Sequence, residues 1–501
     1  MKYETVIGFE VHVELSTDTK VFCGCSTTFG QEPNTAVCPV CLGMPGSLPV
    51  LNKKAVDYSI KAALALNCDV APLTVFERKN YYYPDLPKNY QISQLRENLG
   101  VNGYVEVPVE GKTKRVRINN IHLEEDAGKN VHPENAGADE YSLVDLNRAG
   151  TPLLEIVSEP DIRSVEEAEA YMQTLRNILR YIAISDCNMH EGRLRFEVNI
   201  SHRPEGETEL PDFRSEIKNI GSIKSAIRAI RYEQKRQARA LDRGEKLIQD
   251  TRLWDDDRGR TEAMRGKEGA SDYRYFPEPD LVDVEIDEAW LKDIRESLPE
   301  LPEAKKQRFI QDYELPEYDA GILTSSISLS DYYENANSVA QIAIVGDSWK
   351  AGATKNKKVA QTSKAISNWI MTELLRELNE RDLEPEDSPI TPENLAGLVK
   401  LIDDGAISGK IAKTVFAEML ESGDDPKKIV EEKGLVQVKD DSQIEAWVDE
   451  AIASNPGPAD DYRSGKDRAM GFLVGQVMKA SRGKANPQMV NELIRKKLRG
   501  E

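Results

Sequence analysis

The alternation of apolar and polar positions near the start of the chain predicts a β-strand. Apolar side chains recur at every second position over residues 7–15. Because successive side chains of a strand point to opposite faces, one face would be apolar and the other would carry Glu10, His12 and Glu14. Similar patterns predict further strands near residues 103–109, 113–118, 143–146, 153–158 and 194–200.

Apolar residues spaced three and four apart indicate helices elsewhere. One helix is predicted to follow Ser164, which would cap it, with Glu167 completing a capping box. Another is predicted over about 222–240, where isoleucines form an apolar stripe. After about residue 277, prolines lead into mainly helical sequence, and Pro392 marks a further helix start.

The change from strand-rich to helical sequence predicts an α+β fold with several domains. A chain of 501 residues is long enough for two to four domains with separate cores. We predict a large domain over 1–292 with a mixed or antiparallel sheet, an all-helical domain over 293–405, and a small helical tail domain over 406–501.

The charge is unevenly distributed along the chain. The formal net charge is −20, which argues against a protein that binds polyanions over its whole surface. Residues 463–501 nevertheless carry +7, so all other residues together carry −27. The basic segment 463–501 is therefore a better candidate for contact with RNA than the basic helix over 222–240. A solvated helix surface would equally explain the charges of that helix. No apolar run is long enough for a transmembrane helix and no signal peptide is recognisable, so we expect a cytoplasmic protein without a membrane partner.

Four cysteines lie within nineteen residues: Cys23, Cys25, Cys38 and Cys41. Two short pairs, C-x-C and C-x-x-C, are joined by a twelve-residue loop, which is a spacing suited to tetrahedral Zn²⁺. Four thiolates leave no open coordination position, so such a site would be structural. The alternative is four unrelated buried thiols. We call residues 23–41 the cysteine knuckle.

Carboxylates gather in three segments that the strand pattern could bring together. Glu10 and His12 share a strand face, Glu124 and Glu125 follow a second strand, and Glu155 lies on a third. Hard divalent cations such as Mg²⁺ prefer oxygen ligands, so these residues could form a metal site. The alternative is an acidic sheet face that is solvated or salt-bridged.

Residues 76–94 combine basic side chains with four tyrosines around two prolines. Arg78, Lys79 and Lys88 could neutralise phosphates, and tyrosines can stack on a base. An ordinary aromatic surface loop is the alternative. No Walker A motif is present, because Glu106 stands where its first glycine should be. A Gly/Ser-rich amidase segment is also missing, so any ammonia used would come from another protein.

Several longer motifs resemble one protein family. The opening VIGFEVHVEL at 6–15 and the knuckle sequence CPVCLGMPGSLP at 38–49 carry the resemblance, and matching segments follow in the same order at 83–88, 121–128, 147–161, 216–219, 272–280 and 472–479. Together they resemble the B subunits of the aspartyl/glutamyl-tRNA(Asn/Gln) amidotransferases, the GatB family, over nearly the whole chain. Segments 188–195 and 213–215 depart from the family pattern.

The resemblance implies a ligase that forms a C–N bond with glutamine as amido donor. Such a protein uses ATP to convert the carboxylate of Glu-tRNA(Gln), and often of Asp-tRNA(Asn), to an acyl phosphate, which ammonia then attacks. A partner amidase, the glutaminase of the complex, releases the ammonia from glutamine, and a small third protein braces the pair in a heterotrimer. The implied large domain is a cradle with a glutamine-synthetase-like core.

The resemblance also implies roles for individual residues. Mg²⁺ is expected on Glu10, His12, Glu125 and Glu155, with Glu124 as a rival for Glu125. Arg78, Lys79 and Lys88 are expected to contact ATP or substrate. The residues expected to contact tRNA are Lys484, Arg495, Lys496, Lys497 and Arg499. Two other functions stay open at this point: a non-catalytic tRNA-binding scaffold, and a free-standing amide ligase for small molecules. The preferred misacylated tRNA is also left open.

Overall fold

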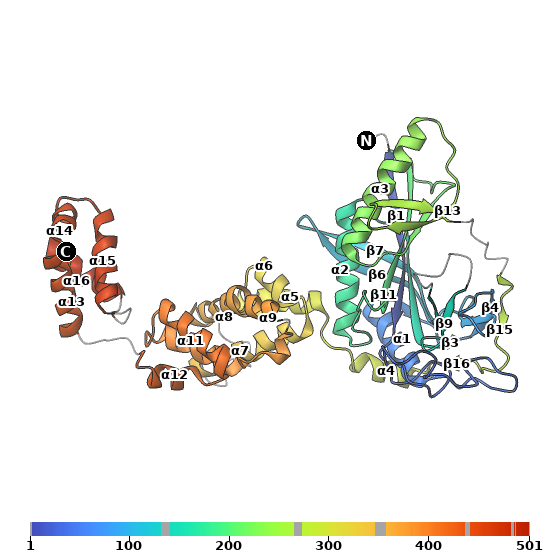
Figure 1. Ribbon diagram of the computed structural model, residues 1–501, viewed down its shortest axis with the longest axis horizontal. Helices are drawn as coiled ribbons and strands as arrows, with labels where there is room; N and C mark the ends of the chain where they lie inside the picture. Colours follow the sequence, from blue (N-terminus) through green and yellow to red (C-terminus); the bar gives the residue numbers. More distant parts are fainter. Residues whose placement is uncertain are drawn as a thin grey trace. The chain divides into compact units, whose positions relative to one another are not determined.

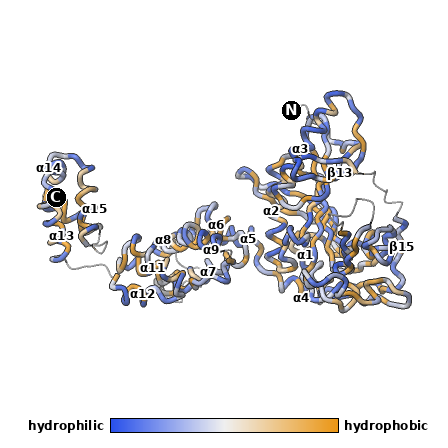
Figure 2. Tube along the Cα trace, in the orientation of Figure 1, coloured by the Kyte–Doolittle hydropathy of each residue, from blue (hydrophilic) through white to orange (hydrophobic). Residues whose placement is uncertain are grey.

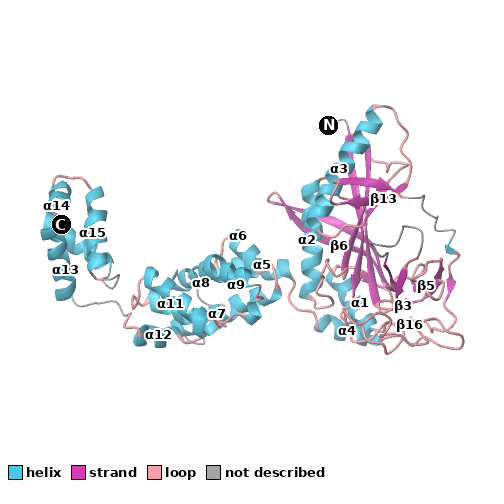
Figure 3. Cartoon of the chain, in the orientation of Figure 1, coloured by secondary structure: helices cyan, strands magenta, loops and turns pink. Residues whose placement is uncertain are grey.

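The computed structural model describes residues 3–131, 141–264, 273–345, 357–381, 383–435, 441–481, 485 and 487–499. Contacts divide the chain into two compact units, residues 1–301 and 302–501. The first unit contains the sheets and the second is helical, as Figure 3 shows. The predicted α+β class is therefore confirmed. No helix among the described residues is both long and apolar enough to cross a bilayer.

The first unit is built on a large sheet of nine strands within the described residues (Figure 1). In spatial order the strands are β14 (Arg260–Ala263), β13 (Asp250–Asp255), β12 (Ser215–Lys218), β11 (Leu194–Pro204), β1 (Tyr3–Glu14), β10 (Pro152–Ser158), β7 (Lys112–Glu125), β6 (Gly100–Val109) and β2 (Asp69–Val70). Neighbouring strands are antiparallel except β12 and β13, which run parallel. The first strand, β1, thus lies in the interior of the sheet between β11 and β10.

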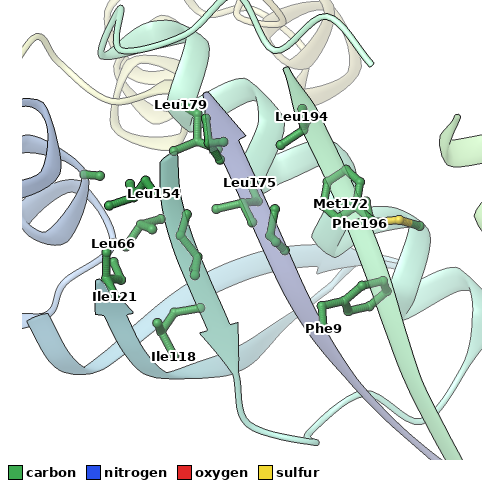
Figure 4. Packing of buried hydrophobic residues seen from close by; sticks show 14 of the residues in the cluster. Phe9, Leu66, Ile118, Ile121, Leu154, Met172, Leu175, Leu179, Leu194 and Phe196 are labelled. Carbon is green, nitrogen blue, oxygen red and sulfur yellow. The ribbon is translucent and has the colours of Figure 1, made fainter. Parts of the chain in front are cut away.

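One face of the sheet is apolar and is covered by helices α1 (Lys53–Ala65), α2 (Val165–Tyr181) and α3 (Ile223–Asp242). Phe9 on β1 stacks on Tyr171 of α2 at a ring separation of 5.3 Å and meets Phe196 of β11 edge-on at 6.0 Å. Figure 4 shows strand and helix side chains of this core, among them Phe9, Phe196 and Leu175. Because apolar side chains alternate along β1, its remaining side chains face the opposite side, where the candidate site lies.

The helix starts follow the predicted capping. Ser164 accepts a hydrogen bond from the Glu167 backbone N–H at 3.0 Å, and the Glu167 carboxylate accepts one from Arg163 N at 2.8 Å. Ser222 caps α3 in the same way by accepting from Ser225 N. These side chains satisfy backbone donors that a helix N-terminus leaves free.

Smaller sheets and one helix complete the first unit. They are β4 (Glu77–Asn80) with β5 (Tyr90–Ser93) and β15 (Phe276–Pro277), β3 (Leu73–Thr74) with β16 (Val284–Glu285), β8 (Lys129–Val131) with β9 (Leu143–Asp145), and α4 (Glu288–Glu296). Strand β5 contacts the end of β7, because the Gln91 amide donates to Glu125 O at 2.7 Å. Residues 77–93 therefore lie beside the acidic end of β7.

The second unit contains two separate hydrophobic clusters. The first cluster involves α5 (Pro302–Tyr313), α6 (Glu317–Leu323), α7 (Ile327–Val345), α8 (Lys357–Trp369), α9 (Leu375–Arg381), α10 (Pro392–Asp403), α11 (Gly409–Ser422) and α12 (Pro426–Glu432). The second involves α13 (Asp441–Ser454), α14 (Pro456–Arg463), α15 (Arg468–Ala480) and α16 (Pro487–Arg499). Figure 2 shows hydrophobic and hydrophilic residues mixed along these helices, as helices with one packed face require.

The structural divisions differ from the predicted domain limits. The division falls at 301/302 rather than at 292/293 because Leu298 and Leu301 pack on the first core. The predicted boundary at 405/406 lies inside the first helical cluster, since α10, α11 and α12 pack together. A π-helical turn at Ile370–Leu374 also joins α8 to α9.

Candidate functional site

A row of three side chains crosses the open face of the large sheet. The strand register sets His12 of β1 opposite Glu155 of β10, and Glu155 opposite His122 of β7. The Glu155 Oε2 atom lies 3.5 Å from His12 Nε2 and 3.1 Å from His122 Nε2. Glu124 joins the row, with its Oε1 atom 3.9 Å from His12 Nε2. We call these four residues the histidine–carboxylate cluster.

Opposite charges set the protonation of this cluster. Burial lowers the pKa of His12, but the carboxylates around it, chiefly Glu155, raise that pKa to about 9. Burial would raise the pKa of Glu155, but His122 and His12 hold it well below its usual range. Burial and the Glu155 charge raise the pKa of Glu124. Without a cation, therefore, Glu155 is ionised and His12 carries a proton near neutral pH.

The donors of this cluster fit a divalent cation. One ligand atom from each of His12, Glu124 and Glu155 lies within 4.8 Å of the others, which suits ligands around a single ion. The other ring nitrogen of His12, Nδ1, is buried and has no hydrogen-bond partner among the described side chains. Carboxylates and imidazole suit ions such as Mg²⁺ or Mn²⁺ in combination.

A second carboxylate group lies on the same face. Glu10 pairs in register with Glu197 of β11, and Glu216 of β12 completes a set whose oxygens lie within 4.8 Å. The Lys218 ammonium donates to Glu197 at 2.7 Å, and Asn199 donates to Glu10 at 3.0 Å. Glu10 thus belongs to a neighbouring all-carboxylate group rather than contacting Glu155 directly.

A cavity of about 380 Å³ adjoins this carboxylate group. Glu10, Ser158 and Asn199 line one part, and residues 210–214 line another. The volume falls within the range of small-molecule pockets, roughly 300–1,000 Å³. The Asn199 Oδ1 atom is buried without a hydrogen-bond partner among the described groups, so it is available to a ligand.

The predicted ligand Glu125 lies apart from the histidine–carboxylate cluster. Its Oε1 atom accepts from the Lys88 ammonium and, at 2.9 Å, from Ile92 N. The reason is the pleat of β7, which sends the side chains of Glu124 and Glu125 to opposite sides. Of the two rivals, the structure brings Glu124 together with His12 and Glu155. The Lys88–Glu125 pair instead lines a small cavity of about 80 Å³ next to the knuckle.

The three basic side chains predicted to contact ATP or substrate have different environments. The Arg78 guanidinium forms a bidentate salt bridge with the Glu278 carboxylate, with hydrogen bonds of 2.7 and 2.8 Å. Lys88 forms an ion pair with Glu125. Lys79 forms no ion pair with any described residue, and its ammonium lies over the rings of Tyr81 and Tyr273. Burial alone would lower the pKa of Lys79. The Glu124 charge and other nearby groups outweigh burial, so the pKa of Lys79 lies above its ordinary value. Of these three basic side chains, Lys79 is therefore the one that forms no ion pair with a described carboxylate.

The cysteine knuckle brings all four predicted thiols together. Their Sγ atoms lie within 4.8 Å of one another, and the Sγ atoms of Cys38 and Cys41 are 3.9 Å apart. Four thiolates at a Zn–S distance of about 2.3 Å would stand roughly 3.8 Å apart, so the geometry fits zinc. A hydrogen bond from Cys23 and the nearby Lys20 charge lower the pKa of Cys41.

The predicted tRNA contacts of the tail fall into three groups. Arg495 and Lys496 on α16 are exposed. Lys497 pairs with Glu445 at 2.7 Å and Asp449 at 2.6 Å, and Arg499 pairs with Asp467 at 2.9 Å and lies over the Tyr462 ring. Lys484 lies outside the described residues. Of the five predicted tRNA contacts, Lys497 and Arg499 thus form ion pairs within the tail domain itself.

Sequence reasoning did not assign His122, Glu197 or Glu216 to a site. His122 stands two residues before Glu124, so alternation could have put the two side chains on one face of their strand, and Glu197 lies on a predicted strand. Glu216 gave no such signal, because its strand is only four residues long.

Comparisons with known proteins identify the family of the chain. A family model described as the GatB/GatE catalytic domain matches residues 5–292, and a model described as the GatB domain matches residues 353–498. The chain thus carries a catalytic domain of the GatB/GatE type, followed by a GatB domain in its helical part.

Full-length relatives refine that assignment. Proteins named as the B subunit of aspartyl/glutamyl-tRNA(Asn/Gln) amidotransferase match over nearly all of both chains. They include those of Carboxydothermus hydrogenoformans (55% identical, covering 99% of each chain), Geotalea uraniireducens (53%, covering 100% of each) and Persephonella marina (52%, covering 100% of each). The chain belongs to this family, the B subunits of the aspartyl/glutamyl-tRNA amidotransferases. The resemblance found in the sequence is confirmed.

Proposed function

We propose that this chain activates and amidates the side-chain carboxylate of Glu-tRNA(Gln), of Asp-tRNA(Asn), or of both, at the expense of ATP. The observation that carries the proposal is the histidine–carboxylate cluster on the open face of a sheet whose sequence matches a catalytic domain. A scaffold that only held tRNA would have no need for these buried donors. Partners of the kind that the family resemblance implies, an amidase and a small bracing protein, would supply ammonia and hold the assembly together.

The chemistry explains why cations are needed. A carboxylate oxygen of the aminoacyl group attacks the γ-phosphorus of ATP and ADP leaves, which gives an acyl phosphate. Ammonia then attacks the carbonyl carbon, and phosphate leaves with the oxygen that made the bond. A bound Mg²⁺ would neutralise phosphate oxygens during transfer. We assign the Mg²⁺ ion to His12, Glu124 and Glu155. Glu10, with Glu197 and Glu216, would form a second acidic group on the same sheet face.

The nucleotide is assigned to the cavity beside Glu10. The cavity adjoins the strand that carries both Glu10 and His12, so a nucleotide there would direct its phosphates along the sheet face toward the cluster. Arg214 could contact phosphate, Phe213 could stack on the base, and Asn199 Oδ1 could accept a hydrogen bond. Lys79 interacts electrostatically with Glu124 and Glu155, so its ammonium could pair with the substrate carboxylate near the cluster.

The proposal predicts how the nitrogen source depends on partners. With ATP and charged tRNA, the isolated chain should form amide from a high concentration of ammonium but not from glutamine, because it lacks an amidase segment. Adding the amidase and the small bracing protein should make glutamine effective. The assay measures Gln-tRNA and Asn-tRNA formed from both misacylated tRNAs. Glutamine hydrolysis by the pure chain, or no ATP-dependent amide even in the full complex, would refute the proposal.

The raised pKa of His12 predicts a pH dependence of cation binding. The folded pKa of about 9 exceeds the ordinary value of 6.5, so the protonated ring stabilises the cation-free protein below pH 6.5, and this stabilisation is lost as pH rises through 9. A cation must displace that proton, so its affinity should rise up to about tenfold per pH unit between these values. Calorimetric titration with Mn²⁺ measures this. His190→Gln, at an exposed position, should retain the dependence, whereas a pH-independent affinity would exclude His12 as a ligand.

The cysteine knuckle is predicted to hold one structural zinc per chain. Metal analysis of the native protein should find about one Zn²⁺, and the Cys38→Ser/Cys41→Ser variant should lose it and unfold at a lower temperature, because zinc binding contributes to folding. Native protein that contains no zinc and is equally stable in chelator would mean that the four thiols only pack together.

A further inference from the structure

A lysine is completely buried beside the cysteine knuckle. Lys20 has no exposed surface, although lysine is rarely buried without partners. Its ammonium donates to Ala36 O at 2.8 Å and to Leu146 O at 3.4 Å, and lies 3.6 Å from Cys41 Sγ. The three ammonium hydrogens therefore reach two backbone carbonyls and one sulfur.

The charge of the knuckle explains why a buried ammonium is tolerated there. Four thiolates around Zn²⁺ carry a net charge of −2 in a site that is partly shielded from water. Burying an unpaired charge is costly, so a cation in contact with a thiolate lowers the cost for both groups. Lys20 meets Cys41, which is the most buried of the four sulfur donors.

The same ammonium reaches a segment outside the knuckle. Leu146 lies in the connection from β9 to β10, and β10 carries the chain on to Glu155. Further hydrogen bonds join the knuckle to this connection. The Asn147 side chain accepts from Ala36 N at 2.8 Å and donates to Glu32 O at 2.7 Å, and Val21 N donates to Gly150 O at 2.9 Å.

Asn34 of the knuckle forms two further hydrogen bonds to the segment 144–146. Its side chain donates to Val144 O at 2.9 Å and accepts from Leu146 N at 2.8 Å. Gly150 N in turn donates to Asp126 O at 2.9 Å, directly after β7. The knuckle is thus tied to the chain segments that lead out of β7 and into β10, the two strands that carry Glu124 and Glu155.

We propose that Lys20 is the counter-ion of the four-cysteine metal site and a positioning residue that couples metal binding there to the segment 144–150. When the metal leaves, thiolates take up protons, so the negative charge that the Lys20 ammonium balances would decrease and the hydrogen bonds that fix this segment would loosen. The relevance of that segment to catalysis rests on the proposed function, but the coupling itself does not.

The test uses the full chain and two measurements that are independent of enzyme activity. Lys20→Met keeps the length of the side chain and removes its charge. We expect this variant to release zinc to the chelator 4-(2-pyridylazo)resorcinol at least tenfold faster than wild type. We also expect faster amide hydrogen exchange at 144–150, both in this variant and in zinc-depleted wild type. Lys53→Met, at an exposed lysine of α1, is the matched control and should change neither measurement.

A second variant keeps the proposal testable if Lys20→Met does not fold. Asn147→Ala removes two hydrogen bonds to the knuckle without touching a sulfur, so it should accelerate exchange at 144–150 while zinc release stays within about twofold of wild type. Unchanged zinc release in a folded Lys20→Met would overturn the counter-ion role. Unchanged exchange at 144–150 after zinc removal would overturn the coupling, as would native protein without zinc. None of these outcomes depends on amide formation, so a failed amidation assay would be a separate result.

Discussion

Replacing His12 by alanine, or Glu155 by glutamine, should lower tRNA-dependent ATP cleavage by roughly 10²–10³-fold or more, because each change removes a donor that would hold a cation against the transferring phosphate. Glu155 interacts with both His12 and His122, so its replacement should be the more severe of the two. Glu10→Gln should also lower ATP cleavage, through the neighbouring carboxylate group. Binding of charged tRNA should stay close to normal in all three variants. ADP formation and filter binding measure the two properties.

Substitutions of neighbouring glutamates test whether the loss of ATP cleavage is specific to the proposed ligands. Glu124→Gln should raise the Mg²⁺ concentration needed for half-maximal ATP cleavage, whereas Glu125→Gln should leave that concentration near the wild-type value, because Glu125 is engaged with Lys88. Glu159 follows the end of β10 and contacts Asn119, so Glu159→Gln serves as a control without effect. Normal ATP cleavage by His12→Ala at saturating Mg²⁺ would remove the cluster from the mechanism.

Removal of the last helical cluster, by ending the chain at residue 435, should weaken binding of charged tRNA at least tenfold and raise its KM. The basic segment 463–501 carries +7 in a chain otherwise at −27, and contacts between basic side chains and phosphates release counterions. Affinity should therefore fall less steeply with salt after truncation, by about one unit of log–log slope for each phosphate contact that the truncation removes. A cut at 405 would be a poorer test, since it would remove α11 and α12 from the preceding core.

Point variants on α16 separate RNA contact from folding. Arg495→Ala/Lys496→Ala should reproduce part of the decrease in affinity and reduce the salt slope by up to about two units. Lys497→Ala/Arg499→Ala should mainly lower the unfolding temperature of the tail, because both side chains form ion pairs within it. If truncation changes neither tRNA affinity nor its salt slope, the tail serves packing or docking of a partner protein and tRNA is held elsewhere.

Much of the fold follows from local patterns in the sequence. Alternation of apolar residues identified β1 and β10, and the capping residue Ser164 marked the start of α2, because strand and helix periods are local properties. The position of β1 inside the sheet could not be predicted, since its partners β10 and β11 follow about 150 and 190 residues later. The π-helical turn at Ile370–Leu374 likewise has no local signal in the sequence.

The candidate site was predictable in its residue types but not in its grouping. The sequence indicated Glu10, His12 and Glu155, but strand register decides that His12 faces Glu155 while Glu10 faces Glu197. The choice between Glu124 and Glu125 depends on one residue of register, which no composition argument can supply. Arg78 was predicted to meet substrate, yet its carboxylate partner Glu278 lies 200 residues away in the sequence.

The fate of the oxygen atoms of the substrate carboxylate tests the acyl-phosphate mechanism most directly. Glu-tRNA(Gln) labelled with ¹⁸O in the side-chain carboxylate is incubated with the chain, Mg²⁺-ATP and ammonium, and the released inorganic phosphate is examined by mass spectrometry. Attack of the carboxylate on the γ-phosphorus, followed by displacement by ammonia, predicts one ¹⁸O atom in each phosphate and formation of ADP. Unlabelled phosphate accompanying amide formation, or ¹⁸O recovered in AMP, would contradict activation through an acyl phosphate.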